Sequence, residues 1–209
     1  MSSLRAIQAE KWQAICYTVL CAVFFLALLR GKATTNLTRR INKMKKALVI
    51  VDIQNDITKN YKEIIDNINK AIDWAVDNDI HVVYIRHENL SDGTRTFKPD
   101  TRGAELAPDM KIVSDNVFTK SKGNALTSEG FTDFISKNEI CEFYLTGADA
   151  VACVKSTCYN MCKANYGVTV LSDCITSYDK RKIPEMLHYY KNNGSNISSL
   201  NDLLGSVTQ

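Results

Sequence analysis

The stretch KKALVIVD, residues 45–52, decides the fold class. Residues 47–51 form an unbroken apolar run rich in β-branched side chains, which is typical of a strand buried on both faces of a sheet. A carboxylate, Asp52, follows the run directly. We therefore expect a compact α/β domain that begins at about Met44 and opens on its first strand.

Runs of strand type alternate with stretches of helical periodicity from this point to the end of the chain. We expect further strands over residues 80–85, 113–118, 141–145, 168–171 and 196–198. We expect helices over residues 61–76, from Ser128 through Ile135, over 153–165 with Gly167 as the C-terminal cap, and over 183–191. Such alternation implies βαβ units, so residues 44–209 are predicted to form a three-layer α/β/α domain with a roughly six-stranded, mostly parallel sheet.

The composition is that of an ordinary globular protein and limits the partners. The chain has 209 residues, of which 45% are hydrophobic and 23% charged, with a net charge of +3. These values exclude collagen-like, disordered and multi-pass membrane classes, and the small charge excess gives no reason to expect a nucleic-acid partner. None of the seven cysteines forms a C-x-x-C pair, so we expect free thiols in a reducing, cytoplasmic domain and no zinc finger.

The segment 1–43 carries a separate signal. Residues 12–29, WQAICYTVLCAVFFLALL, contain no charge and would span about 27 Å as a helix, close to the roughly 30 Å of a bilayer core. The cations follow the run, which predicts an outside N-terminus and a cytoplasmic domain. A cleaved signal peptide fits poorly because no A-x-A site follows closely. Two interpretations stay open, a single transmembrane helix that anchors the protein and an extension upstream of the true gene start.

Three reactive side chains are predicted to meet at one edge of the sheet. Ligands of parallel sheets bind beyond the carboxyl ends of the strands. Asp52, Lys120 and Cys153 each follow a predicted strand, and Cys153 also opens a predicted helix. A helix N-terminus lowers the pKa of a thiol, Asp52 can accept the thiol proton, and Lys120 can hold the two together. The pattern favours nucleophilic catalysis by cysteine.

Three motifs in this order resemble the isochorismatase-like cysteine hydrolases, a family that includes nicotinamidases and related amidases. The motifs are VDIQND at 51–56, FTK at 118–120 with NAL at 124–126, and GADAVACV at 147–154; the resemblance runs from about Met44 to Leu204. It implies a catalytic triad of Asp52, Lys120 and Cys153. It also implies a cis peptide bond between Ala148 and Asp149, with the N–H groups of Asp149 and Cys153 as oxyanion donors. Attack of Cys153 on a carbonyl carbon would release ammonia or an amine and leave a thioester that water cleaves.

The sequence departs from the family pattern around this site. Ala150 and Val151 stand where Thr-Asp is usual, so we expect altered support of the turn with the nucleophile retained. Ile57 replaces an aromatic residue and Leu126 a common Phe, which predicts an unusual pocket. The candidate pocket residues are Gln54, Ile57, Arg86, His87 and Leu126. Arg86 and His87 either contact a substrate carboxylate or form a surface pair.

The resemblance also bears on metals, substrate and assembly. Nicotinamidases carry a metal on an Asp-x-His motif and a later His, whereas RHEN at 86–89 places only His87 and Asn89 at those positions. We therefore expect no metal and no other cofactor. True isochorismatases lack the nucleophilic cysteine, so Cys153 argues against vinyl-ether hydrolysis. A small-molecule amide is the expected substrate, and a homo-oligomer is expected because the family often forms one.

Two alternatives to an amidase stay open. One is a non-catalytic member of the same fold that keeps the pocket for a ligand. The other is a thiol redox protein, because Cys153, Cys158 and Cys162 fall on one predicted helix. Cysteines four residues apart rarely form a good disulfide within a regular helix, so they are more often core residues.

Overall fold

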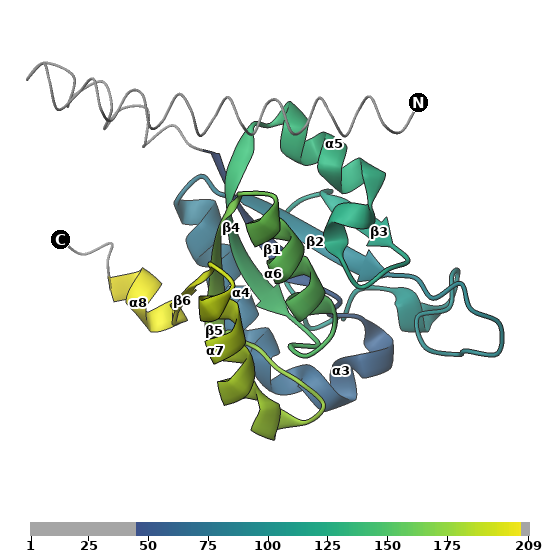
Figure 1. The fold of residues 1–209 in the computed structure, drawn as a ribbon. Helices are drawn as coiled ribbons and strands as arrows, with labels where there is room; N and C mark the ends of the chain where they lie inside the picture. The colour runs from purple at the N-terminus through teal and green to yellow at the C-terminus, as the bar shows by residue number, and fades with distance from the viewer. Residues whose placement is uncertain (1–44, 206–209) are drawn as a thin grey trace, which may run out of the picture. The chain divides into compact units, whose positions relative to one another are not determined.

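The structure, a computed structural model, describes residues 45–205 (Figure 1). Within these residues six strands form one sheet in the order β3-β2-β1-β4-β5-β6. The strands are β1 (Lys45–Val51), β2 (His81–His87), β3 (Val117–Lys120), β4 (Ile140–Gly147), β5 (Gly167–Ile175) and β6 (Asn196–Ser198). β1 pairs with β2, β2 with β3, β4 with β5 and β5 with β6, each in parallel. The predicted α/β class and parallel sheet are confirmed.

The first strand is buried on both faces, as its composition predicts. Ala47, Val49 and Val51 belong to one hydrophobic cluster, whereas Leu48 and Ile50 belong to a second cluster. Because successive side chains of a strand point to opposite faces, the two clusters are the two layers between sheet and helices. β1 lies inside the sheet, between β2 and β4.

The helices divide between these two faces (Figure 1). Buried residues of α5 (Glu129–Lys137), α6 (Cys153–Lys163) and α7 (Ile183–Asn192) join the first cluster, and those of α4 (Ile65–Asp77) and α8 (Leu200–Gly205) join the second. A short helix, α3 (Asn55–Tyr61), follows β1, and four 3-10 turns cover Lys62–Ile64, Arg102–Ala104, Ala125–Thr127 and Lys180–Lys182. Helices on both faces of the sheet make the three predicted layers.

Several boundaries differ from the sequence-based expectation; β5, for example, runs on to Ile175, and α8 was not expected. Helical structure begins before residue 61, because α3 already covers Asn55–Tyr61. β3 begins at Val117 and not at 113. The side chains of Ser114 and Asn116 donate to the carbonyl of Val82, which a backbone N–H would bond if the strand were longer. Gly167 starts β5 and caps no helix; Asn165, with φ of 63°, takes the left-handed conformation after α6.

The segment 1–43 lies outside the described residues, and so does the apolar run at 12–29. Among residues 45–205, no helix is long and apolar enough to cross a membrane. The anchor and the upstream extension therefore stay predictions.

Candidate active site

The structure brings Asp52, Lys120 and Cys153 together at the carboxyl edge of the sheet. Asp52 directly follows β1, Lys120 is the last residue of β3, and Cys153 is the first residue of α6. The Nζ atom of Lys120 donates a hydrogen bond to Oδ2 of Asp52 at 2.8 Å and another to Sγ of Cys153 at 3.4 Å. One ammonium group therefore links the acid and the thiol.

A fourth side chain, His87, completes the contacts of this ammonium group. His87 is the register partner of Lys120 across the β2–β3 ladder. Its Nδ1 atom lies 3.1 Å from Nζ of Lys120, and it is the acceptor there because an ammonium group has only donors. Burial, and then the charge of Lys120, lower the pKa of His87. His87 is thus a neutral acceptor for Lys120.

The backbone at Asp52 is shaped for this placement. Asp52 has a φ of 55°, in the left-handed region, and its N–H extends the ladder by donating to the carbonyl of Ile85 at 2.9 Å. Aspartate tolerates this conformation better than most residues. Its Oδ1 atom is buried and has no hydrogen-bond partner among the described residues. One carboxylate oxygen is therefore bound by Lys120 and the other still has acceptor capacity.

Burial dominates the protonation of the acid and the thiol. It raises the pKa of Asp52 even against the opposing charge of Lys120. Burial, and then the negative charge of Asp52, raise the pKa of Cys153 to about 12. The expectation of a lowered thiol pKa is thus wrong for this state, because desolvation and the charge of Asp52 together outweigh the charge of Lys120.

The other candidate pocket residues have different surroundings. The amide of Gln54 is buried and bonded on both sides to backbone, to the N–H and carbonyl of His87 and the carbonyl of Ala104. Arg86 forms an ion pair with Glu88 at 2.8 Å. Ile57 and Leu126 pack against the second and the first hydrophobic cluster respectively. Of the five candidates, His87 contacts Lys120 through its side chain, and Gln54 contacts Asp52 through its backbone N–H, which donates to the carbonyl of Asp52 at 3.0 Å.

A short turn leads from β4 to Cys153. Gly147 has a φ of 111°, and the peptide bond between Ala148 and Asp149 is cis. Most N–H groups of this turn have acceptors: Ala148 donates to Val51, Ala150 to Thr176, Val151 to the side chain of Asp149, and Ala152 and Val154 to the carbonyl of Asp149. Within residues 45–205, no hydrogen-bond acceptor is found for the N–H groups of Asp149 and Cys153.

Two sets of contacts near the site were not predicted, although Asp149 and Asp56 lie within the motifs quoted above. The carboxylate of Asp149 accepts hydrogen bonds from Tyr61, Val151 and Tyr178. The ring of Phe97, in the loop after β2, lies 5.7 Å from the ring of His87. Asp56 holds this loop by accepting from the N–H of Phe97 at 2.6 Å. Such contacts join segments that are distant in the sequence, so no local sequence pattern predicts them.

The site does not fit a metal ion. Ligand atoms of Asp52, His87 and Cys153 lie within 4.8 Å of one another, and among the described residues they form a candidate metal group. Nζ of Lys120, however, lies between 2.8 and 3.4 Å from an atom of each. The ammonium group of Lys120 already supplies a positive charge among these three ligand atoms, and it would repel a metal cation placed there.

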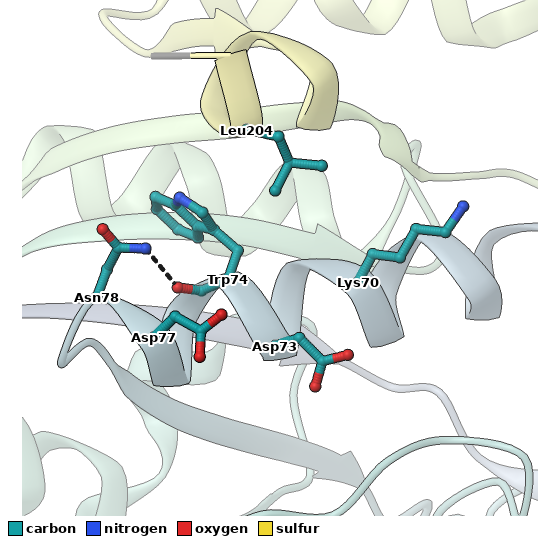
Figure 2. A pocket seen from close by; sticks show the side chains of 6 residues that line it. All are labelled: Lys70, Asp73, Trp74, Asp77, Asn78 and Leu204. Carbon is teal, nitrogen blue, oxygen red and sulfur yellow. Dashed lines mark hydrogen bonds between the residues drawn. The ribbon is translucent and has the colours of Figure 1, made fainter. Parts of the chain in front are cut away.

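A separate hollow of about 340 Å³ lies between α4 and α8 (Figure 2). Its lining residues are Lys70, Asp73, Trp74, Asp77, Asn78 and Leu204. This part of α4 leads into the start of β2, whereas the reactive side chains lie at the ends of the strands. The hollow is therefore distinct from the site described above.

Fold and site define a class: an α/β protein whose buried lysine joins an acid and a thiol at the carboxyl edge of a parallel sheet. The family model described as the isochorismatase domain matches residues 46–202. The chain therefore belongs to the isochorismatase family, and the resemblance inferred from the motifs is confirmed at that level.

Known relatives are distant in sequence and close in fold. The chain is 24% identical over 159 residues to the uncharacterized isochorismatase family protein YddQ of Bacillus subtilis. The matched region covers 70% of this chain and 88% of that protein. It is similar to an isochorismatase-like hydrolase from Alkaliphilus metalliredigens, at 19% identity, a TM-score of 0.70, and 78% and 98% coverage of the two chains. It is also similar to the N-carbamoylsarcosine amidase of Thermoplasma acidophilum, at 22% identity, a TM-score of 0.66, and 75% and 97% coverage.

Proposed function

We propose that this protein is a cysteine-dependent hydrolase that cleaves a carbon–nitrogen bond of a small amide through a thioester. The observation that carries the proposal is the Lys120 ammonium group, which contacts Asp52 and Cys153 at the start of α6. An acid and a thiol joined by one cation are the parts that nucleophilic catalysis by cysteine requires. The amidase named among the structural relatives supports a carbon–nitrogen bond as the target.

Acylation begins with proton transfer from the thiol. Because the pKa of Cys153 is raised, the resting sulfur is a thiol, and Asp52 takes its proton as Sγ attacks the carbonyl carbon. The raised pKa of Asp52 makes its carboxylate a stronger base than an exposed one. Lys120 stabilises the negative charge that passes from the carboxylate to the sulfur. The N–H groups of Asp149 and Cys153 receive the oxyanion.

Acylation ends when the tetrahedral intermediate collapses: the carbon–nitrogen bond breaks, Asp52 gives the proton to the leaving amine, and a thioester remains on Cys153. In deacylation, water takes the place of the thiol. Asp52 then takes a proton from water, whose oxygen attacks the thioester carbon. The carbon–sulfur bond breaks, the thiol regains the proton, and the carboxylic acid is released. The cycle needs no redox partner and no metal-bound step.

The test incubates the full-length chain with a panel of primary amides. Released ammonia measures turnover, and intact-mass spectrometry of the protein detects an acyl adduct. We expect at least one amide to be hydrolysed, with an acyl adduct on Cys153, and Cys153→Ala to abolish both. Cys162→Ala is the matched control, since Cys162 lies on the same helix with a half-buried thiol and should keep activity. Ligand binding without Cys153-dependent turnover would favour the binding protein instead.

A further inference from the structure

We propose that Asp149 is the positioning residue that holds the oxyanion-binding turn in place. This inference rests on the function proposed above and names a further residue on which that site depends. Between Gly147 and Cys153 the sequence is Ala-Asp-Ala-Val-Ala, so Asp149 has the one polar side chain in this interval. Support of the turn by side chains within it therefore falls to Asp149.

The carboxylate of Asp149 ties three segments of the chain together. Its Oδ1 atom accepts from the N–H of Val151 at 2.8 Å, inside the turn. Its Oδ2 atom accepts from the hydroxyl of Tyr61 at 2.9 Å, at the end of α3, and from the N–H of Tyr178 at 2.9 Å, beyond β5. Charged acceptors form stronger hydrogen bonds than neutral ones, so this carboxylate is an effective anchor.

The backbone of the same residue continues the anchoring. The carbonyl of Asp149 accepts from the N–H groups of Ala152, at 3.0 Å, and Val154, at 3.1 Å. Side chain and carbonyl together thus take up the N–H groups of Val151, Ala152 and Val154. The N–H groups of Asp149 and Cys153 stay available to a bound oxygen. Asp149 decides where these two donors point.

The negative charge of Asp149 is compatible with an oxyanion nearby because three donors already satisfy it. Burial and the hydrogen bond to Asp149 raise the pKa of Tyr61, so its hydroxyl remains a donor through neutral pH. The charge of Asp149 is not among the main influences on Cys153, which are burial, Asp52 and Lys120. Asp149 should therefore affect the oxyanion without altering the thiol.

Two reactions of Cys153 separate these effects. Alkylation by iodoacetamide displaces iodide at a saturated carbon and forms no oxyanion. Acylation by p-nitrophenyl acetate forms a sulfur–carbon bond through an oxyanion, expels p-nitrophenolate and leaves an acetyl thioester. Loss of one oxyanion donor costs about 100- to 1,000-fold in comparable enzymes. We expect Asp149→Ala, which misplaces donors but leaves them present, to slow acylation about 10- to 100-fold and alkylation less than about twofold.

The experiment measures both rates on the full-length chain for wild type, Asp149→Ala, Asp149→Asn and Tyr61→Phe. Asp149→Asn keeps one carbonyl oxygen and should acylate at an intermediate rate, and Tyr61→Phe, which removes one donor, should lose less than Asp149→Ala. Asp133→Ala, at an exposed position on α5, is the matched control and should behave as wild type. Hydrogen exchange of the Val151 and Tyr178 amides, which should be faster in Asp149→Ala, reports on the turn without any substrate.

Each outcome decides the inference. Slow acylation with normal alkylation and faster exchange supports it. Acylation at the wild-type rate in Asp149→Ala overturns it, and so does an equal fall of both rates, which would show a general loss of the site. If wild type forms no acetyl adduct on Cys153, the proposed function fails, and hydrogen exchange alone then tests whether Asp149 holds the turn. Unchanged exchange at the Val151 and Tyr178 amides in Asp149→Ala would show that Asp149 does not hold the turn.

Discussion

The Nζ atom of Lys120 lies 2.8 Å from Oδ2 of Asp52, and the two side chains are only 0% and 2% exposed. A second lysine–aspartate pair, Lys111 and Asp73, has a distance of 2.6 Å but side chains that are 44% and 55% exposed. The two pairs have similar geometry and opposite solvation. Removing one partner of a buried pair leaves an uncompensated charge, whereas water compensates a surface charge.

Lys120→Met should therefore destabilise the protein by about 3–5 kcal/mol, measured as the free energy of unfolding in urea. Lys111→Met should cost less than about 1 kcal/mol, because the exposed pair contributes little. The double variant Asp52→Asn with Lys120→Met removes both charges and should recover part of the loss. Equal effects of the two single lysine variants would contradict the description of Lys120 as a buried partner of Asp52.

The second prediction concerns the reactivity of Cys153 with iodoacetamide. Since the pKa of Cys153 is raised to about 12, its alkylation rate should keep rising between pH 8 and pH 10. An ordinary thiol would approach a plateau above its pKa of about 8.5. Asp52→Asn removes a charge that opposes the thiolate, so it should speed alkylation at pH 8 while abolishing amide hydrolysis. Peptide mass spectrometry locates the label, and a plateau near pH 8.5 in wild type would refute the prediction.

The third prediction concerns pH and His87. The pKa of His87 is lowered in the folded state, so the unfolded chain binds a proton there more readily. The free energy of unfolding should therefore decrease as the pH falls from 7 toward 5. His87→Gln removes this titration and keeps an oxygen acceptor for Lys120, so its pH dependence should be flatter. His188→Gln, on α7, is the control that leaves the ring of His87 in place. Identical slopes for wild type and His87→Gln would argue against a neutral His87.

The fourth prediction concerns the entry to the turn. A Cβ atom on Gly147 would overlap the carbonyl oxygen of Val51, and the φ of 111° at Gly147 is unfavourable for any residue with a side chain. Gly147→Ala should therefore cost about 3 kcal/mol or more, from strain and steric overlap together. Gly93→Ala is the matched control, because φ is 77° there but no atom lies within 4 Å. Its cost should be about 1 kcal/mol, from strain alone. Thermal or urea unfolding measures both, and similar losses would show that the contact with Val51 is unimportant.

Much of the fold could be predicted from local sequence. Apolar runs located the strands near their true positions, and the buried face of α4, with Ile65, Ile68 and Ile72, follows directly from helical periodicity. The boundaries were less predictable. Ser114 and Asn116 shorten β3 through side-chain bonds to Val82, which lies more than thirty residues away in sequence. Such competition depends on a neighbouring strand that no local pattern describes.

The candidate site shows the same division. Asp52, Lys120 and Cys153 could be singled out because the carboxyl ends of parallel strands share one edge of the sheet. The role of His87 as acceptor for Lys120 follows from the β2–β3 register. The anchoring of Asp149 depends on Tyr61 and Tyr178, which lie 88 and 29 residues away along the chain. Contacts of this kind exist only once the sheet and its connections are assembled.

The sequence by itself determined the α/β class, the order of the six strands along the chain, and the three side chains that meet at the edge of the sheet. Hydrophobic periodicity and strand ends are local properties, so they can be read along the chain. Only the tertiary structure decided the protonation of Cys153. The helix N-terminus, a local feature, predicts a lower pKa, whereas burial and the carboxylate of Asp52 raise it. Desolvation is set by everything packed around a group, and that packing is a property of the whole fold.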